Sequence, residues 1–172
     1  TLELRNAAGA QSTVTLDADV YAITPVPQRR NTTTMLGRPM GYLQVNDMIT
    51  QASTPMSSAF SAFRSAGVEE LVIDMRYNGG GLVSIANDLA SYVAGSRASG
   101  DVFASLLYND KRASANDQIF RFGSFASALG VSRVYVLAGE RTCSASEQVI
   151  NGLRPFVDVV TIGDTTCGKP VG

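Results

Sequence analysis

Two stretches with the same strand–turn–helix pattern constrain the fold of this chain more than any other feature. Residues 71–75 form a nearly unbroken apolar run that leads through three glycines into helical spacing over 82–93. Residues 134–138 repeat the apolar run and lead into a helix that we expect over 144–153. Apolar runs of this length are typical of strands covered on both faces, as in parallel sheets. Because strands alternate with helices, the sequence predicts an α/β layer fold.

Further segments extend this pattern. Residues 41–45 predict a strand, and Thr54-Pro55 supplies an N-cap and a first helical position. The helix that follows has one apolar stripe, made by Met56, Ala59, Phe60 and Phe63. Two more strands are expected at 102–108 and 157–162.

The N-terminal part of the chain carries a different pattern. Residues 1–24 alternate apolar and polar side chains around Asn6-Ala7-Ala8-Gly9, which predicts a β-hairpin. Residues 25–39 contain three prolines and no apolar periodicity, so we expect a linker or surface loop there. The main core is then expected at 40–172. The hairpin is either part of a separate small β-domain or a decoration on that core.

Composition excludes several classes of function. With 172 residues, the chain is long enough for one full core but not for two large domains. Its 14 basic and 15 acidic residues give a net charge of −1 without long runs of either sign, so nucleic acid is not an expected partner. No apolar run approaches the roughly 18 residues of a membrane-spanning helix. With two cysteines and no histidine, the chain lacks a zinc ligand set, and we expect neither metal nor cofactor.

The absence of histidine also restricts covalent catalysis. Neither a Ser-His-Asp triad nor a Cys-His pair can be built from this chain, so a catalytic serine would need a lysine to activate it. Ser144 and Lys169 are our candidates for nucleophile and base. Ser144 and Glu147 also fit a capping box, in which both residues only cap a helix. The two interpretations are compatible, because the N–H of Ala145 at a helix N-terminus is well placed to bind an oxyanion.

These residues carry a family resemblance. The run Cys143-Ser144-Ala145-Ser146-Glu147, followed by Gly168-Lys169, resembles the serine and lysine motifs of the carboxyl-terminal processing, or tail-specific, proteases. Residues 71–81 are similar to that family's strand and glycine loop, and the motifs occur in the family's order. The family serine and lysine lie 25 positions apart, which selects Ser144 rather than Ser146 (169 − 144). The resemblance covers roughly residues 40 to 172.

The resemblance implies an activity, a fold and a location. The activity would be that of a serine endopeptidase that cleaves polypeptides near their C-termini through an acyl-enzyme. The core would have the spiral ββα arrangement of crotonases and Clp-type proteases, truncated at its C-terminus. Residues 1–24 would be the closing strands of a PDZ-like domain. The protein would be extracytoplasmic, in a bacterial periplasm or cell envelope, with polypeptide as its substrate and an unknown oligomeric state.

The glycine loop offers a second oxyanion donor. Three glycines between a buried strand and a helix allow the backbone to approach a ligand closely. We predict Gly80 as the donor, with Gly81 as the next candidate. Asp74 and Arg76 match the family's charged pair before the loop, and we interpret them as a structural ion pair. We interpret Glu147 as a structural residue as well. Asn78 opens the loop and is expected to have a structural role near the site.

Two other functions compete with this hypothesis. Gly163 to Lys169 satisfies the GxxxxGK pattern of a phosphate loop, which would indicate nucleotide binding. Pro170 argues against that function, because a phosphate loop needs Ser or Thr there to hold magnesium. The other alternative is a catalytically inactive module that binds peptides.

The two cysteines flank the proposed chemistry. Cys143 directly precedes Ser144, and Cys167 stands two residues before Lys169. If the two catalytic side chains are within hydrogen-bond reach, the Cα atoms of Cys143 and Cys167 could fall within the roughly 4.4–6.8 Å that a disulfide needs. The extracytoplasmic location implied by the resemblance would favour that bond, which would link nucleophile to base. The alternative is two unrelated buried thiols.

Overall fold

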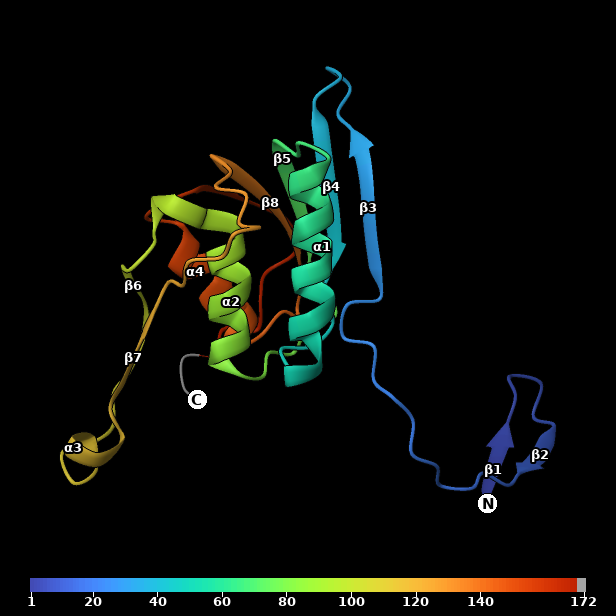
Figure 1. The fold of residues 1–172 in the computed structure, drawn as a ribbon. Helices are drawn as coiled ribbons and strands as arrows, with labels where there is room; N and C mark the ends of the chain where they lie inside the picture. The colour runs from blue at the N-terminus through green and yellow to red at the C-terminus, as the bar shows by residue number, and fades with distance from the viewer. Residues whose placement is uncertain (170–172) are drawn as a thin grey trace.

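A computed structural model describes residues 1–169, and its centre is a five-stranded sheet. The strand order is β3-β4-β5-β8-β9 (Figure 1). Its strands are β3 (Gln28–Thr33), β4 (Pro39–Gln44), β5 (Glu70–Asp74), β8 (Arg133–Ala138) and β9 (Asp158–Gly163). β3 runs antiparallel to β4, and the pairs β4–β5, β5–β8 and β8–β9 are parallel. The predicted α/β fold is therefore confirmed at the level of fold class.

Three helices lie against one face of this sheet (Figure 1). They are α1 (Ser53–Ser65), α2 (Val83–Ala94) and α4 (Ala145–Leu153). The four residues of the apolar stripe predicted for the first helix are all buried in α1. They join a core with the inward side chains of the central strands, namely Leu43, Leu71, Ile73, Val134 and Val136. The helix starts at Ser53, one residue before the predicted N-cap.

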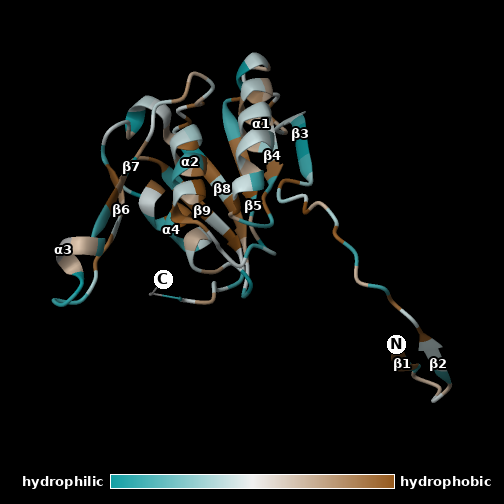
Figure 2. Ribbon diagram, turned by 60° about the horizontal axis from the view of Figure 1, so that its bottom comes forward, coloured by the Kyte–Doolittle hydropathy of each residue, from teal (hydrophilic) through white to brown (hydrophobic). Residues whose placement is uncertain are grey.

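The opposite face of the sheet is only half-buried. Outward side chains of the central strands include Tyr42, Val72, Tyr135 and Leu137, and each is partly accessible. We expected these strands to be covered on both faces, but within residues 1–169 the helices cover only one. We expected burial on both faces because each of these strands carries apolar side chains on both sides. Figure 2 shows hydrophobic colouring along β8 and β9.

The segment that we expected to be a linker, residues 25–39, contains the edge strand β3. Its six residues pair with β4 from Gln28↔Gln44 to Thr33↔Pro39. All six are exposed, so the strand has no apolar alternation from which it could be recognised. Backbone hydrogen bonds to β4, rather than side-chain burial, hold it in the sheet.

The remaining elements lie outside the main sheet. β1 (Leu2–Arg5) and β2 (Gln11–Val14) form an exposed hairpin that an extended segment separates from the sheet (Figure 1). β6 (Val102–Leu106) and β7 (Gln118–Arg121) form a second antiparallel pair, with the short helix α3 (Ala113–Asn116) between them. Single 3-10 turns, η1 (Thr50–Ala52) and η2 (Gly95–Arg97), precede α1 and follow α2. None of the helices in residues 1–169 has the length and apolar character that would let it cross a membrane.

The parallel strands bring three separate loops to one edge of the sheet. The glycine loop follows β5, the Ser144 turn follows β8, and the segment that ends at Lys169 follows β9. Parallel strands all end at the same edge, so these loops are neighbours in space. In the sequence, 91 positions separate Asn78 in the first loop from Lys169 in the last segment (169 − 78). That edge is where open α/β sheets bind ligands.

Candidate active site

Ser144 has the most unusual backbone conformation in the described chain. It is the N-cap of α4, with φ 56° and ψ −118°, and no other non-glycine residue among residues 1–169 has a positive φ. This conformation is costly for a residue with a Cβ and persists only where the surrounding contacts impose it. The strain turns the chain sharply between β8 and α4 and leaves the Ser144 side chain half-buried at the sheet edge.

The turn before Ser144 is anchored by Thr142, which is fully buried. The Thr142 hydroxyl donates to the Met75 carbonyl at 2.8 Å and accepts the Gly139 N–H at 3.0 Å. The threonine thereby ties the end of β8 to the end of β5. We did not predict this role, because no spacing in the sequence places residue 142 beside residue 75.

Asn78 joins the glycine loop to the turn that carries Ser144. Its side chain is fully buried, with Nδ2 donating to the Val45 carbonyl at 3.0 Å and Oδ1 accepting the Gly80 N–H at 2.9 Å. Its carbonyl accepts the Cys143 N–H at 3.1 Å and the Ser146 hydroxyl at 3.2 Å. Asn78 therefore positions the loop and the Ser144 turn relative to each other.

We expect Asn78→Ala to lower the free energy of unfolding by roughly 2–4 kcal/mol, because it leaves the buried Gly80 N–H and Val45 carbonyl without partners. Chemical denaturation followed by circular dichroism measures this loss. Asn46→Ala is the control, since the Asn46 side chain only accepts a partly buried bond from Gln44. Equal stability of the two variants would contradict the role given to Asn78.

The glycine loop lies against the turn that carries Ser144. An ideal Cβ on Gly80 would lie 2.8 Å from the Ser144 Cβ and 3.1 Å from the Ala145 nitrogen, so the glycine loop packs directly on the Ser144 turn. The Gly80 N–H is already bonded to Asn78, whereas the N–H groups of Gly81 and Ala145 have no acceptor within the described part of the chain. Of the two glycines that we predicted, Gly81 thus has the available donor. The sequence could not distinguish them, because the choice depends on where the Asn78 side chain points.

The backbone of Lys169 is held next to that of Ser144 by a shared acceptor. The Oε2 atom of Glu147 accepts the Ser144 N–H at 2.8 Å and the Lys169 N–H at 3.0 Å. The two predicted catalytic residues are therefore neighbours in space. The Lys169 residue is, however, exposed. Only its backbone is anchored, since the segment crosses the protein surface after β9.

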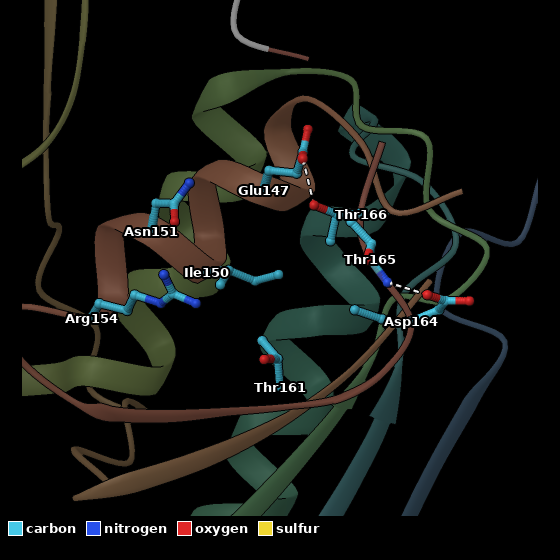
Figure 3. Close-up of a pocket in the computed structure, with 9 residues that line it drawn as sticks. Glu147, Ile150, Asn151, Arg154, Thr161, Asp164, Thr165 and Thr166 are labelled. Atoms are coloured by element: carbon cyan, nitrogen blue, oxygen red, sulfur yellow. Dashed lines mark hydrogen bonds between the residues drawn. The ribbon is translucent and has the colours of Figure 1, made fainter. Parts of the chain in front are cut away.

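Glu147 connects the two halves of the site. Besides Oε2, its Oε1 atom accepts the Thr166 hydroxyl at 2.7 Å and the Gly168 N–H at 2.8 Å (Figure 3 shows the Thr166 bond). Burial by itself would raise the pKa of Glu147, but the hydrogen bonds from Thr166, Ser144, Gly168 and Lys169 outweigh it and lower the pKa. The glutamate is thus part of a capping arrangement and also the anchor of the lysine segment.

These bonds also bear on nucleotide binding. A phosphate loop needs free backbone N–H groups to surround phosphate oxygens. Here the N–H groups of Gly168 and Lys169 already bind a carboxylate, which would repel a phosphate. The segment from Gly163 to Lys169 therefore does not have the arrangement of a phosphate site.

The Glu147 contacts predict an acid-sensitive site. Because the folded-state pKa lies below the unfolded value of about 4.3, this contribution to stability is present above that pH and is lost as pH falls through the folded pKa. We expect Glu147→Gln to remove this part of the acid dependence, because the glutamine amide does not titrate in this pH range. Thermal melts from pH 3 to pH 7 test this expectation. A parallel pH profile for parent and variant would refute it.

Cys143 and Cys167 form a disulfide in the structure, with their Cα atoms 5.2 Å apart. The Cys167 N–H also donates to the Thr142 carbonyl at 3.0 Å. Both sulfur atoms and a Glu147 oxygen lie within 4.8 Å of one another. Disulfide sulfurs are not thiolate ligands, and the carboxylate is already saturated with hydrogen bonds, so this cluster does not offer a metal site in the oxidised state.

Asp74 and Arg76 form an ion pair at the end of β5. Arg76 binds both carboxylate oxygens, at 3.0 Å through Nε and 2.7 Å through a terminal nitrogen, and the Tyr42 hydroxyl adds a bond of 2.8 Å. Burial opposes ionisation of Asp74, but these bonds lower its pKa. Each group of the cluster is satisfied by another, which is what a structural role requires.

Known proteins share the fold of this chain. A solved structure described as an S41 protease of Bacteroides fragilis superposes with a TM-score of 0.80 at 30% identity, covering 97% of this chain and 46% of that one. The photosystem II D1 C-terminal processing protease has the same fold, with a TM-score of 0.66 at 21% identity over 92% of this chain and 41% of that one. A carboxyl-terminal-processing protease of Picosynechococcus is 23% identical over 91% of this chain and 35% of its own length.

A family match defines the class of this chain. Residues 39–172 match the model of peptidase family S41, and the chain belongs to that family. The predicted resemblance to the carboxyl-terminal processing proteases is thereby confirmed. The chain spans less than half the length of these three relatives.

Proposed function

We propose that this chain is the catalytic core of a serine endopeptidase that uses a Ser144–Lys169 dyad to cleave polypeptides near their C-termini. The observation that carries the proposal is the shared Glu147 acceptor, which holds the backbone of both residues at one point. The strained φ of Ser144 supports it, because such conformations cluster at active sites. The S41 family match supports peptidase activity in general.

In this mechanism, the Ser144 hydroxyl attacks the scissile carbonyl carbon while the neutral Lys169 amine accepts its proton. The N–H groups of Ala145 and Gly81 stabilise the oxyanion that forms. Collapse of the tetrahedral intermediate breaks the C–N bond, and the lysine returns the proton to the leaving amine. Water, deprotonated by the same lysine, then hydrolyses the acyl-enzyme. A polypeptide bound over the site would cover Lys169 and exclude water from it.

The finer structural and cellular expectations belong to the same proposal. We assign the core to the spiral ββα arrangement of crotonases and Clp-type proteases, and the hairpin β1–β2 to the end of a PDZ-like domain. The Cys143–Cys167 disulfide supports an extracytoplasmic location, since a reducing cytosol keeps most thiols free.

Active-site labelling tests the proposal. The intact protein is incubated with a fluorophosphonate, which reacts with activated serines, and the modified residue is located by mass spectrometry. We expect a label on Ser144 and none on the Ser144→Ala variant. Ser146→Ala is the matched control and should still be labelled, because the Ser146 hydroxyl is buried and bonded to Asn78. Peptide binding without any labelling of Ser144 would instead indicate an inactive binding module.

A further inference from the structure

The disulfide joins the segment that carries the proposed nucleophile to the segment that carries the proposed base. Cys143 precedes Ser144, Cys167 lies two residues before Lys169, and 24 positions separate the cysteines. We propose that this bond is a redox switch: the oxidised form is the active peptidase, and reduction lowers turnover by releasing the lysine segment. The inference rests on the proposed function for its activity readout, and a second readout below is independent of activity.

The lysine segment, residues 164–169, has little packing of its own. Five of its six residues are exposed, and only Thr166 is partly buried. A pocket of about 260 Å³ lies between this segment, β9 and α4, with Asn151 and Arg154 of α4 on its wall (Figure 3). Because a cavity rather than a packed core lies along the segment, its position depends on individual bonds.

The bonds that tie the segment to the rest of the described chain lead to the turn of Ser144 or to Glu147, apart from one link of Asp164 to the end of β8. One further bond, from the Thr165 N–H to the Asp164 side chain, lies within the segment. Three donors of the segment bind the Glu147 carboxylate, and the Cys167 N–H binds the Thr142 carbonyl. The disulfide is the one covalent tie among them. Hydrogen bonds at a water-accessible surface exchange readily with solvent. Loss of the covalent tie is therefore expected to let the segment open while the sheet stays folded.

The surroundings of the two sulfurs indicate which sulfur an external thiolate attacks and which sulfur leaves as a thiolate. Cys167 is exposed and Cys143 is only half-exposed, so an external thiolate reaches the Cys167 sulfur more easily. Cys143 stands next to the N-terminus of α4, which stabilises a departing thiolate. The Cys167 sulfur lies 3.6 Å from a Glu147 oxygen, which would disfavour negative charge there.

Reduction by a dithiol then proceeds in two balanced steps. The first thiolate of the dithiol bonds to the Cys167 sulfur, the S–S bond breaks, and its electron pair leaves on Cys143 as a thiolate. The second thiolate of the dithiol then attacks its own sulfur in the mixed disulfide and releases the Cys167 thiolate. The protein gains two electrons, the two released thiolates take up the two protons that the dithiol lost, and the dithiol becomes a disulfide.

The activity test compares oxidised, dithiothreitol-reduced and reoxidised intact protein on an unfolded polypeptide, with EDTA present so that free thiols bind no metal. We expect kcat to fall by about 10- to 100-fold on reduction, since small misplacements of catalytic groups have effects of this size. Reoxidation should restore it. The double variant Cys143→Ser/Cys167→Ser should turn over substrate at the rate of the reduced parent. Addition of the reductant should not change the rate of this variant. Equal rates of oxidised and reduced parent would overturn the proposal.

Hydrogen exchange provides the second readout, and this measurement does not depend on peptidase activity. It is therefore carried out on the Ser144→Ala variant. Reduction should speed exchange of the Gly168 and Lys169 amides at least about tenfold, while amides of β8 stay protected. Unchanged exchange of those two amides would overturn the switch even if the peptidase assignment holds. If the oxidised parent shows no Ser144-dependent cleavage, the proposed function fails, and the exchange data alone decide whether the bond controls this segment.

Discussion

Ser144→Ala and Lys169→Met should each reduce kcat on an unfolded polypeptide by at least about 10⁴-fold, because each removes one member of a dyad that acts as a unit. For the same reason, the double variant should be scarcely slower than either single variant. Steady-state cleavage of a fluorogenic peptide by the intact protein measures both effects. Circular dichroism spectra that match the parent would show that the loss is chemical rather than structural.

Lys169→Arg tests whether residue 169 acts as a base or contributes only a positive charge. Arginine keeps the positive charge and much of the length of lysine, but it does not lose its proton in proteins and cannot act as a base. We expect Lys169→Arg to be as inactive as Lys169→Met. An active arginine variant would show that residue 169 contributes charge only, and it would contradict the assignment of Lys169 as the general base.

Gly80→Ala is expected to combine a large loss of activity with a loss of stability. Gly80 has φ +103°, and an added Cβ would lie 2.8 Å from both the Cys143 carbonyl oxygen and the Ser144 Cβ. The strained backbone should cost roughly 1–3 kcal/mol. The methyl group would also come 3.1 Å from the Ala145 nitrogen, a proposed oxyanion donor, so we expect kcat/KM to fall about 10²- to 10³-fold.

The adjacent Gly79 supplies a matched control. A Cβ on Gly79 meets no atom within 4 Å, and its φ lies outside the positive region. Gly79→Ala should therefore change stability by less than about 1 kcal/mol and leave kcat/KM close to that of the parent. Denaturation curves and rates per folded molecule separate the two contributions. Similar behaviour of the two variants would argue against a specific contact between the glycine loop and the Ser144 turn.

The sequence alone limited the candidate chemistry and located several elements of the core. The absence of histidine excluded the commoner serine and cysteine mechanisms before any fold was considered. The apolar runs around residues 73 and 136 and the helical spacing that follows them placed strands and helices within a few residues of β5, α2, β8 and α4. These features are local, because hydrophobic period and residue type act within one element.

Other features depended on the tertiary structure. The strand β3 has no pattern of its own, since all its side chains are exposed and only pairing with β4 defines it. Which glycine keeps a free N–H depends on the Asn78 side chain, and the packing of Thr142 on Met75 joins the ends of two strands.

Glu147 illustrates the same limit. Its sequence context indicates a helix cap, and it does bind the Ser144 N–H as a cap would. Its bonds to Thr166, Gly168 and Lys169 exist only because β8 and β9 are parallel neighbours and end at the same edge. Local sequence indicated the candidate residues for the chemistry and the positions of β5, α2, β8 and α4. The hydrogen bonds between loops distant in sequence were decided by the sheet, because such bonds form only after the strands have been brought side by side.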